Sequence, residues 1–158
     1  MRYLTRRLGD RDWAEEVAQE TFLRAARQKE ITNERSWLFA VATNLVRDEA
    51  RKDARRRRRL ELLAHEERDR QDTVPQVIAM ESAEDAAIAR RALEALTERD
   101  REALLMREEG LDYSEIAEAL ELSPGSVGTT LSRARRRLVE SYEALQRERE
   151  MREKNAAS

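Results

Sequence analysis

The chain has 158 residues, of which 41% are charged and only 4% aromatic, and its formal net charge is −2 at pH 7. Few Gly and Pro residues favour helices over a sheet, and a hydrophobic fraction of 40% suits two small cores better than one large core. The chain has no cysteine, which excludes disulfides, thiolate metal sites and cysteine nucleophiles. It also lacks an apolar run of membrane-spanning length and a signal-peptide core, so we expect a cytoplasmic protein without membrane insertion.

The N-terminal part of the chain predicts two helices with a polar loop between them. Residues 1–8 are too short to predict a helix by themselves, and Asp12 is placed to cap an amphipathic helix over 13–27. One face of this helix is predicted to be buried and carries Ala14, Val17, Ala18, Thr21, Phe22 and Ala25. After the loop, Ser36 is expected to cap a second helix over 37–59. Its predicted apolar face consists of Trp37, Leu38, Val41, Ala42, Leu45 and Val46.

The second predicted helix becomes strongly basic toward its end. Residues 47–59 contain eight Lys and Arg side chains against three Asp and Glu. A polyanion would respond to this local patch rather than to the net charge, because salt screens each charge beyond about 10 Å. The patch favours contact with nucleic acid, and a nonspecific solvated helix end is the alternative.

Residues 61–81 separate two predicted domains. They lose helical periodicity, are rich in acidic and polar side chains and contain Pro75, which predicts a flexible linker. Ser82 and then Thr97 are each followed three residues later by an Asp, a spacing typical of N-terminal capping boxes. Gly110 is placed to end the second of these helices in the left-handed conformation. The predicted domains are 1–60 and 82–145, with a polar tail over 146–158.

Residues 111–138 predict two short helices joined by a tight turn. Asp112 and Glu115 have the spacing of a capping box, and Ser123 before Pro124 is a start signal for the second helix. Buried positions at helical spacing on the second helix are Val127, Leu131, Ala134 and Leu138. Its opposite face offers small polar groups followed by guanidiniums, which suits a major groove and its flanking phosphates. The whole pattern favours a helix-turn-helix over an ordinary helical hairpin.

These segments, in this order, resemble the extracytoplasmic-function group of the sigma-70 family of bacterial RNA polymerase sigma factors. AEEVAQETFLRAAR and SWLFAVATNLVRDEARKDARRRR resemble sigma region 2, and LTERDREALLMREEGLDYSEIAEALELSPGSVGTTLSRARRRL resembles region 4. The resemblance implies an all-α protein with two small helical domains, a region 2-like bundle and a region 4-like helix-turn-helix, joined by a flexible linker. It also implies a protein that binds core RNA polymerase and directs promoter recognition and melting. The family normally has a further helix before residue 6, so we expect the N-terminal helix to be shortened.

The resemblance implies a role for three sets of residues. The first helix would bind core polymerase through Glu16, Gln19, Glu20 and Arg24. The loop over 28–35 and the second helix would open and read the −10 element through Asn33, Glu34, Arg35, Trp37, Asn44, Arg47, Arg51 and Arg55. Trp37 is more simply interpreted as a core side chain. The helix-turn-helix would read the −35 element through Ser126, Gly128, Thr129, Thr130, Ser132, Arg133, Arg136 and Arg137.

Two positions depart from the family's usual pattern on the −35 reading helix. Gly128 stands where a long basic side chain is usual, and Thr130 stands where an arginine is usual. Each lost bidentate arginine removes about 1–3 kcal/mol of base discrimination, and Gly128 costs up to about 1 kcal/mol of helix stability against Ala. We therefore expect an unusual −35 element or a heavier reliance on the −10 contacts.

Two other functions stay open at this point. A helix-turn-helix activator or repressor would need a dimer interface or sensor domain, and neither is evident. A protein-interaction decoy of the sigma and anti-sigma system would explain the two departures. An enzyme is the least expected class, since His65 has no metal-ligand partners at helical spacing and no catalytic residue, metal or cofactor site is predicted. The expected partners are core RNA polymerase, promoter DNA and an anti-sigma factor.

Overall fold

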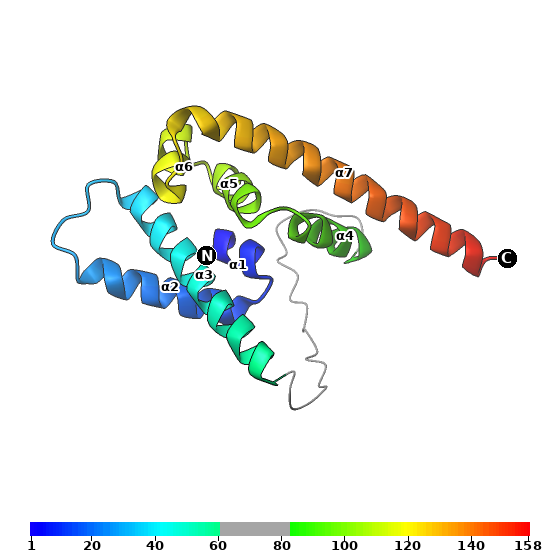
Figure 1. The fold of residues 1–158 in the computed structure, drawn as a ribbon, viewed down its shortest axis with the longest axis horizontal. Coiled ribbons are helices and arrows are strands. Elements are labelled where there is room, and N and C mark those ends of the chain that lie inside the picture. The colour runs from blue at the N-terminus through cyan, green and yellow to red at the C-terminus, as the bar shows by residue number, and fades with distance from the viewer. Residues whose placement is uncertain (61–82) are drawn as a thin grey trace. The chain divides into compact units, whose positions relative to one another are not determined.

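The computed structural model describes residues 1–60 and 83–158, with the side chains of Ala54 and residues 56–60 left aside. The described residues form seven α-helices and no strand, which confirms the predicted all-α class (Figure 1). The chain divides into two compact units, Met1–Thr73 and Val74–Ser158. The predicted linker over 61–81 and the predicted cap Ser82 lie outside the described residues.

Unit 1 contains α1 (Arg2–Leu8), α2 (Arg11–Ala26) and α3 (Glu34–Leu60), and α2 packs against both of the others. The first eight residues, which are too short to predict a helix by themselves, form the short helix α1. Tyr3 and Leu4 are each only 4% exposed, so tertiary packing stabilises a helix that is too short to form alone. Gly9 ends α1 with φ 68°, and its amide donates to the Thr5 carbonyl at 2.8 Å.

The core of unit 1 is built largely from small side chains, which let the helices approach closely. α2 contributes Ala14, Val17, Ala18 and Thr21, and α3 contributes Ala42, Thr43 and Val46. The hydroxyls of Tyr3 and Thr43 are hydrogen-bonded, with 2.7 Å between Oη and Oγ1. The Tyr3 ring also lies against Phe39, with 5.0 Å between ring centroids. A buried polar pair therefore joins α1 to α3 within this small core.

Three local expectations for unit 1 need correction. Asp10, rather than Asp12, caps α2, because its side chain accepts a hydrogen bond from the Trp13 amide at 3.0 Å. α3 begins at Glu34, so Ser36 lies inside the helix, where it is only 1% exposed, instead of capping it. Phe22, which was predicted to be buried, is 62% exposed, because it lies at the edge of the buried stripe of α2.

Unit 2 contains α4 (Ala83–Glu94), α5 (Glu98–Glu108), α6 (Tyr113–Leu120) and α7 (Pro124–Ala156), and α7 packs against all three of the others. Its fully buried apolar side chains include Met106, Leu111, Ile116, Val127 and Leu131. Leu96, Leu104 and Ala134 form a further cluster, with Leu93 and Leu138 packed against it. The predicted buried face of the second helix of the pair is therefore confirmed, with Leu138 at its partly exposed end.

α7 continues through most of the segment expected to be a polar tail. The helix runs to Ala156, and Figure 1 shows it as one long rod that passes α4. Near its end, Nη1 of Arg149 donates to Oδ1 of Asp85 on α4 at 2.7 Å. The helix thus passes the predicted domain boundary at residue 145, and this contact joins its distal part to α4.

The turns around the helix pair follow the sequence signals closely. Gly110 has φ 88°, and the Leu111 amide donates to the Met106 carbonyl at 3.1 Å, which closes the end of α5. The Asp112 and Glu115 capping box is present, with its two hydrogen bonds at 2.8 and 3.0 Å. Ser123 occupies the N-cap of α7, but its side chain makes no capping hydrogen bond.

The turn between α6 and α7 uses an unusual residue. Glu121 adopts a left-handed conformation with φ 54° and ψ 43°. The Leu122 amide donates to the Ala117 carbonyl at 2.8 Å, so the turn is tightly closed. A non-glycine residue in this conformation costs roughly 1 kcal/mol, so the tight turn of the helix pair stores strain.

Candidate nucleic-acid interface

The predicted −35 reading face of α7 separates into parts that differ in exposure. Thr129, Ser132 and Arg136 are exposed, and their helical spacing places them opposite the buried stripe of Val127, Leu131 and Ala134. Two hydroxyls and one guanidinium therefore face outward together. This outward group contains only one side chain that can make the bidentate contact to guanine typical of base readout.

Thr130 does not belong to the exposed face. It is only 5% exposed, so the structure does not present it beside the other predicted −35 readers. The reason is positional, because Thr130 lies three residues after Val127 and four before Ala134, which places it at the edge of the buried stripe. The interface therefore loses one of its predicted polar groups to the core.

Gly128 lies beside an aromatic side chain that sequence reasoning missed. A Cβ built on Gly128 would lie 3.6 Å from Cε2 of Tyr113, at the start of α6. The Tyr113 residue is 44% exposed, and the Arg107 guanidinium lies 5.6 Å from its ring centroid. Arg107 is held in turn by a 2.9 Å hydrogen bond from Nη1 to the Leu111 carbonyl. No periodic signal links Tyr113 to Gly128, so only the fold brings these groups together.

Arg133 and Arg137 reach a carboxylate on α5. Nε and Nη2 of Arg133 donate to both carboxylate oxygens of Asp100, the shortest contact being 2.6 Å from Nη2 to Oδ1. Nη1 of Arg137 donates to Oδ2 of the same group at 3.3 Å. The hydrogen bonds from Arg133 hold the pKa of Asp100 below its usual value, although burial alone would raise it. The Asp100 side chain therefore contacts α7 and does not take the capping role predicted for it. Thr97 caps α5 as predicted, because its hydroxyl accepts a hydrogen bond from the Asp100 amide at 3.2 Å.

On α3, one polar and basic stripe carries the predicted −10 contacts. Asn44, Arg47, Arg51 and Arg55 follow at spacings of three, four and four residues, which places them along one face of the helix. All except the half-buried Arg47 are exposed. Arg51 forms an ion pair with Asp48 at 4.0 Å, with both side chains largely exposed, so the pair neutralises the stripe only weakly.

The predicted strand-capturing loop is shorter than expected. Glu34 and Arg35 belong to the first turn of α3 and are exposed, whereas Asn33 precedes the helix and is half-buried. The Asn33 carbonyl accepts a hydrogen bond from the Trp37 amide at 3.0 Å. Trp37 is half-buried, so its ring is available only in part to a partner.

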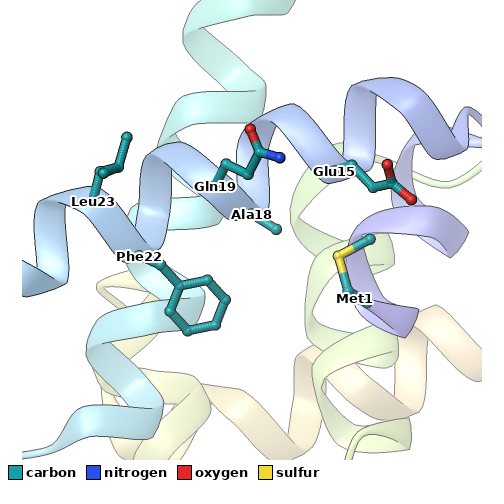
Figure 2. A pocket seen from close by; sticks show the side chains of 6 residues that line it. All are labelled: Met1, Glu15, Ala18, Gln19, Phe22 and Leu23. Atoms are coloured by element: carbon teal, nitrogen blue, oxygen red, sulfur yellow. The ribbon is translucent and has the colours of Figure 1, made fainter.

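The predicted polymerase-binding surface of α2 is exposed for the most part. Glu16, Gln19 and Arg24 are exposed, and the half-buried Glu20 accepts from Nε of Arg24 at 2.9 Å. Two apolar side chains missed by the prediction extend this surface: Phe22 is 62% and Leu23 54% exposed. Both line a shallow groove together with Met1, Glu15, Ala18 and Gln19, and Figure 2 shows the two side chains leaving α2 in different directions. Adjacent exposed apolar side chains of this size are typical of binding surfaces.

Other kinds of site find no support in the described part of the chain. Within residues 1–60 and 83–158, no group of three or more acidic or His side chains is placed to hold a metal ion. The helices described in these ranges are each too short or too polar to cross a membrane.

Comparison with known proteins assigns each unit to a family. Sigma-70 region 2 matches residues 1–56, and sigma-70 region 4 matches residues 86–138. The ECF RNA polymerase sigma factor SigL of Mycobacterium tuberculosis strain H37Rv is 46% identical over 55 residues, and the same protein of strain CDC 1551 matches equally. This match covers 32% of the chain and only 31% of the relative's length.

A solved structure shows the same fold over most of the chain. It is the sigma factor RpoE from Bartonella quintana, crystallised in complex with the anti-sigma factor NepR. The TM-score is 0.68 at 23% sequence identity, and the match covers 89% of this chain and 88% of the other. Two sigma-70 regions, matched over residues 1–56 and 86–138 in the order expected of a sigma factor, place the chain in the sigma-70 family, and the partial match to SigL supports its extracytoplasmic-function group.

Proposed function

We propose that this protein directs core RNA polymerase to promoters, with unit 1 contacting the −10 element and the helix pair of unit 2 contacting the −35 element. The observation that carries the proposal is that each unit matches its own sigma region and presents its own polar and basic helix face. Two separate DNA-contacting faces on one chain are what a two-element promoter requires. A regulator with a single helix-turn-helix has no need of the first unit.

In unit 1, the stripe of Asn44, Arg47, Arg51 and Arg55 forms the proposed −10 contact. Its three guanidiniums lie at one-turn intervals along the helix, which suits contacts to successive phosphates of one strand. Asn44 has both a donor and an acceptor for base edges. We assign strand opening to the start of α3, where Glu34 and Arg35 are exposed beside Asn33.

In unit 2, the polar face of α7 forms the proposed −35 contact, through the exposed Thr129, Ser132, Arg136 and Arg137 and the half-buried Ser126 and Arg133. Among the exposed arginines of this face, Arg136 lies opposite the buried stripe of α7. Because Thr130 is buried and Gly128 has no side chain, base discrimination here rests on few groups. We therefore propose that promoter choice depends more on the −10 element than on the −35 element.

Core polymerase is the proposed partner of α2. Charged and polar groups (Glu16, Gln19, Glu20 and Arg24) flank the exposed Phe22 and Leu23. An apolar centre with a charged rim is the usual anatomy of a protein interface. An anti-sigma factor is the proposed inhibitor, and the complex of the structural relative RpoE with NepR supports this kind of partner.

A decoy that binds sigma-system proteins without reading DNA is the second candidate. The small number of outward base-reading groups on α7 favours it. The two candidates differ in what the stripe on α3 does, because a decoy does not need it.

A pair of neighbouring variants on α3 tests the proposal. Holoenzyme made with Arg51→Ala should bind a promoter fragment more weakly. The slope of log Kobs against log salt concentration should also become less steep by about one unit. Lys52→Ala is the matched control, because Lys52 is also largely exposed, pairs with Glu49 at 3.6 Å and lies off the stripe by helical position. Equal effects of the two variants would show that only general charge matters and would contradict the proposed −10 contact.

A further inference from the structure

We propose that Asp100 is a positioning residue for DNA binding, which holds Arg133 and Arg137 together on α7 as a paired phosphate contact. The inference rests on the proposed function, because it concerns the same DNA-facing helix. It adds a residue from α5 that does not itself face DNA and that no sequence pattern of the helix pair indicates. It also assigns the two arginines to the DNA backbone rather than to base readout.

The contacts show one carboxylate serving two guanidiniums. Arg133 binds Asp100 through Nε at 3.2 and 3.1 Å and through Nη2 at 2.6 Å. Arg137, one helical turn further along α7, binds Oδ2 through Nη1 at 3.3 Å. The pair therefore keeps one net positive charge after the carboxylate is counted.

Burial separates the carboxylate from the guanidiniums. The Asp100 side chain is 0% exposed, whereas Arg133 and Arg137 are 36% and 47% exposed. The carboxylate thus lies in the core and the arginines extend from it toward solvent. An exposed arginine loses much rotamer freedom when it binds a phosphate, and two arginines already held in place lose less.

The direction of the pair matches the rest of the proposed interface. Ser126, Thr129, Arg133 and Arg137 follow at spacings of three, four and four residues, so they share one side of α7. The hydroxyls lie at the N-terminal end of this line and the guanidiniums at the other. A duplex that contacts Thr129 would therefore place its backbone over the two arginines.

Simple electrostatics and the positioning role predict opposite changes in DNA affinity for the substitution Asp100→Asn. Asp100→Asn removes a negative charge close to a polyanion site, and by charge alone DNA binding should become tighter. If the carboxylate positions the arginines, the same variant should bind more weakly. The sign of the change therefore distinguishes positioning from simple electrostatics.

The test measures binding of a labelled, random-sequence 30-base-pair duplex to the full chain by fluorescence anisotropy. All chains carry Arg51→Ala and Arg55→Ala, so that α3 contributes less to the signal. Asp100→Asn should raise Kd about 3- to 10-fold, the effect of losing the preorganisation of one or two side chains. Asp85→Asn is the matched control, since it removes a carboxylate of α4 that binds α7 far from Arg133 along the chain, and it should leave Kd unchanged.

A double-mutant cycle separates positioning from damage to the fold. On an Arg133→Ala background, Asp100→Asn should have a much smaller effect than it has alone. An equal effect on both backgrounds, or tighter binding by Asp100→Asn alone, would overturn the inference. If circular dichroism shows that Asp100→Asn does not fold, the binding of Arg133→Lys tests the inference instead. This variant keeps the positive charge but loses the planar guanidinium that makes several hydrogen bonds to Asp100. Weaker binding by Arg133→Lys supports positioning, and unchanged binding overturns it.

The proposed function and the inference fail in different ways. If the chain without the Asp100 substitution does not bind the duplex even with Arg51 and Arg55 restored, DNA contact itself fails. If that chain binds and the Asp100 variant binds equally well, only the positioning role is lost.

Discussion

Gly128→Ala should stabilise unit 2. Gly128 lies within α7, where a glycine costs about 1 kcal/mol of folding free energy relative to alanine. The added Cβ would lie 3.6 Å from Cε2 of Tyr113, an ordinary van der Waals contact that requires no movement of the ring. We therefore expect the free energy of unfolding to rise by about 1 kcal/mol, which corresponds to roughly 4–8 °C in Tm for a unit of this size.

The assay is urea denaturation followed by circular dichroism, with Gly125→Ala as the comparison. A Cβ on Gly125 would meet nothing within 4 Å, and this residue lies in the first turn of α7, where helix propensity counts for less. Gly125→Ala should therefore change stability less than Gly128→Ala does. A loss of stability in Gly128→Ala would refute the reasoning, because it would mean that Tyr113 requires the space that Gly128 leaves.

Three further predictions concern the turn, the buried ion pair and the surface of α2. Glu121→Gly should raise the free energy of unfolding by up to about 1 kcal/mol in the same assay, because glycine relieves the left-handed strain at φ 54°; a loss of stability would contradict this. The folded-state pKa of Asp100 lies below the ordinary value of 3.8, so its ion pair stabilises unit 2 above that pH and is lost as pH falls below it. Thermal melts from pH 6 to pH 2 should therefore show a larger stability loss in the unsubstituted chain than in Asp100→Asn, and parallel losses would argue against the pair. Phe22→Ser should weaken core polymerase binding at least several-fold in a pull-down titration with little change in Tm, since this side chain is 62% exposed; unchanged binding would remove Phe22 from the interface.

The sequence was most informative where the signal is local. The Asp112 and Glu115 capping box, the Thr97 cap and the left-handed Gly110 all form as predicted, because each depends on residues a few positions apart. The buried stripe of α7 follows from helical spacing alone in the same way. These signals sufficed to predict two helical modules in the correct order, with a helix-turn-helix in the second.

The sequence failed where a distant partner decides the outcome. Asp100 has the spacing of a capping box, but its side chain binds Arg133, which is 33 residues away. Phe22 fits the apolar face of α2 by periodicity, yet α1 and α3 leave it exposed. Thr130 lies at the edge of the buried stripe, where periodicity alone does not distinguish core from surface. Each error concerns a side chain whose environment is set by another helix.

These same corrections change the view of the proposed promoter contacts. Of the eight predicted −35 residues, Thr130 is buried and Arg133 is shared with Asp100, whereas on α3 the exposed Asn44, Arg51 and Arg55 keep their predicted face. Base readout on α7 therefore has fewer exposed candidate side chains than was predicted, and this is the basis for the proposed reliance on the −10 element.

Run-off transcription with purified core RNA polymerase tests the central claim most directly. With a library of promoter fragments, the chain should produce discrete transcripts that core polymerase alone does not, and Arg51→Ala should reduce them more than Lys52→Ala does. A chain that binds core polymerase but yields no specific transcript would contradict the account and favour the decoy.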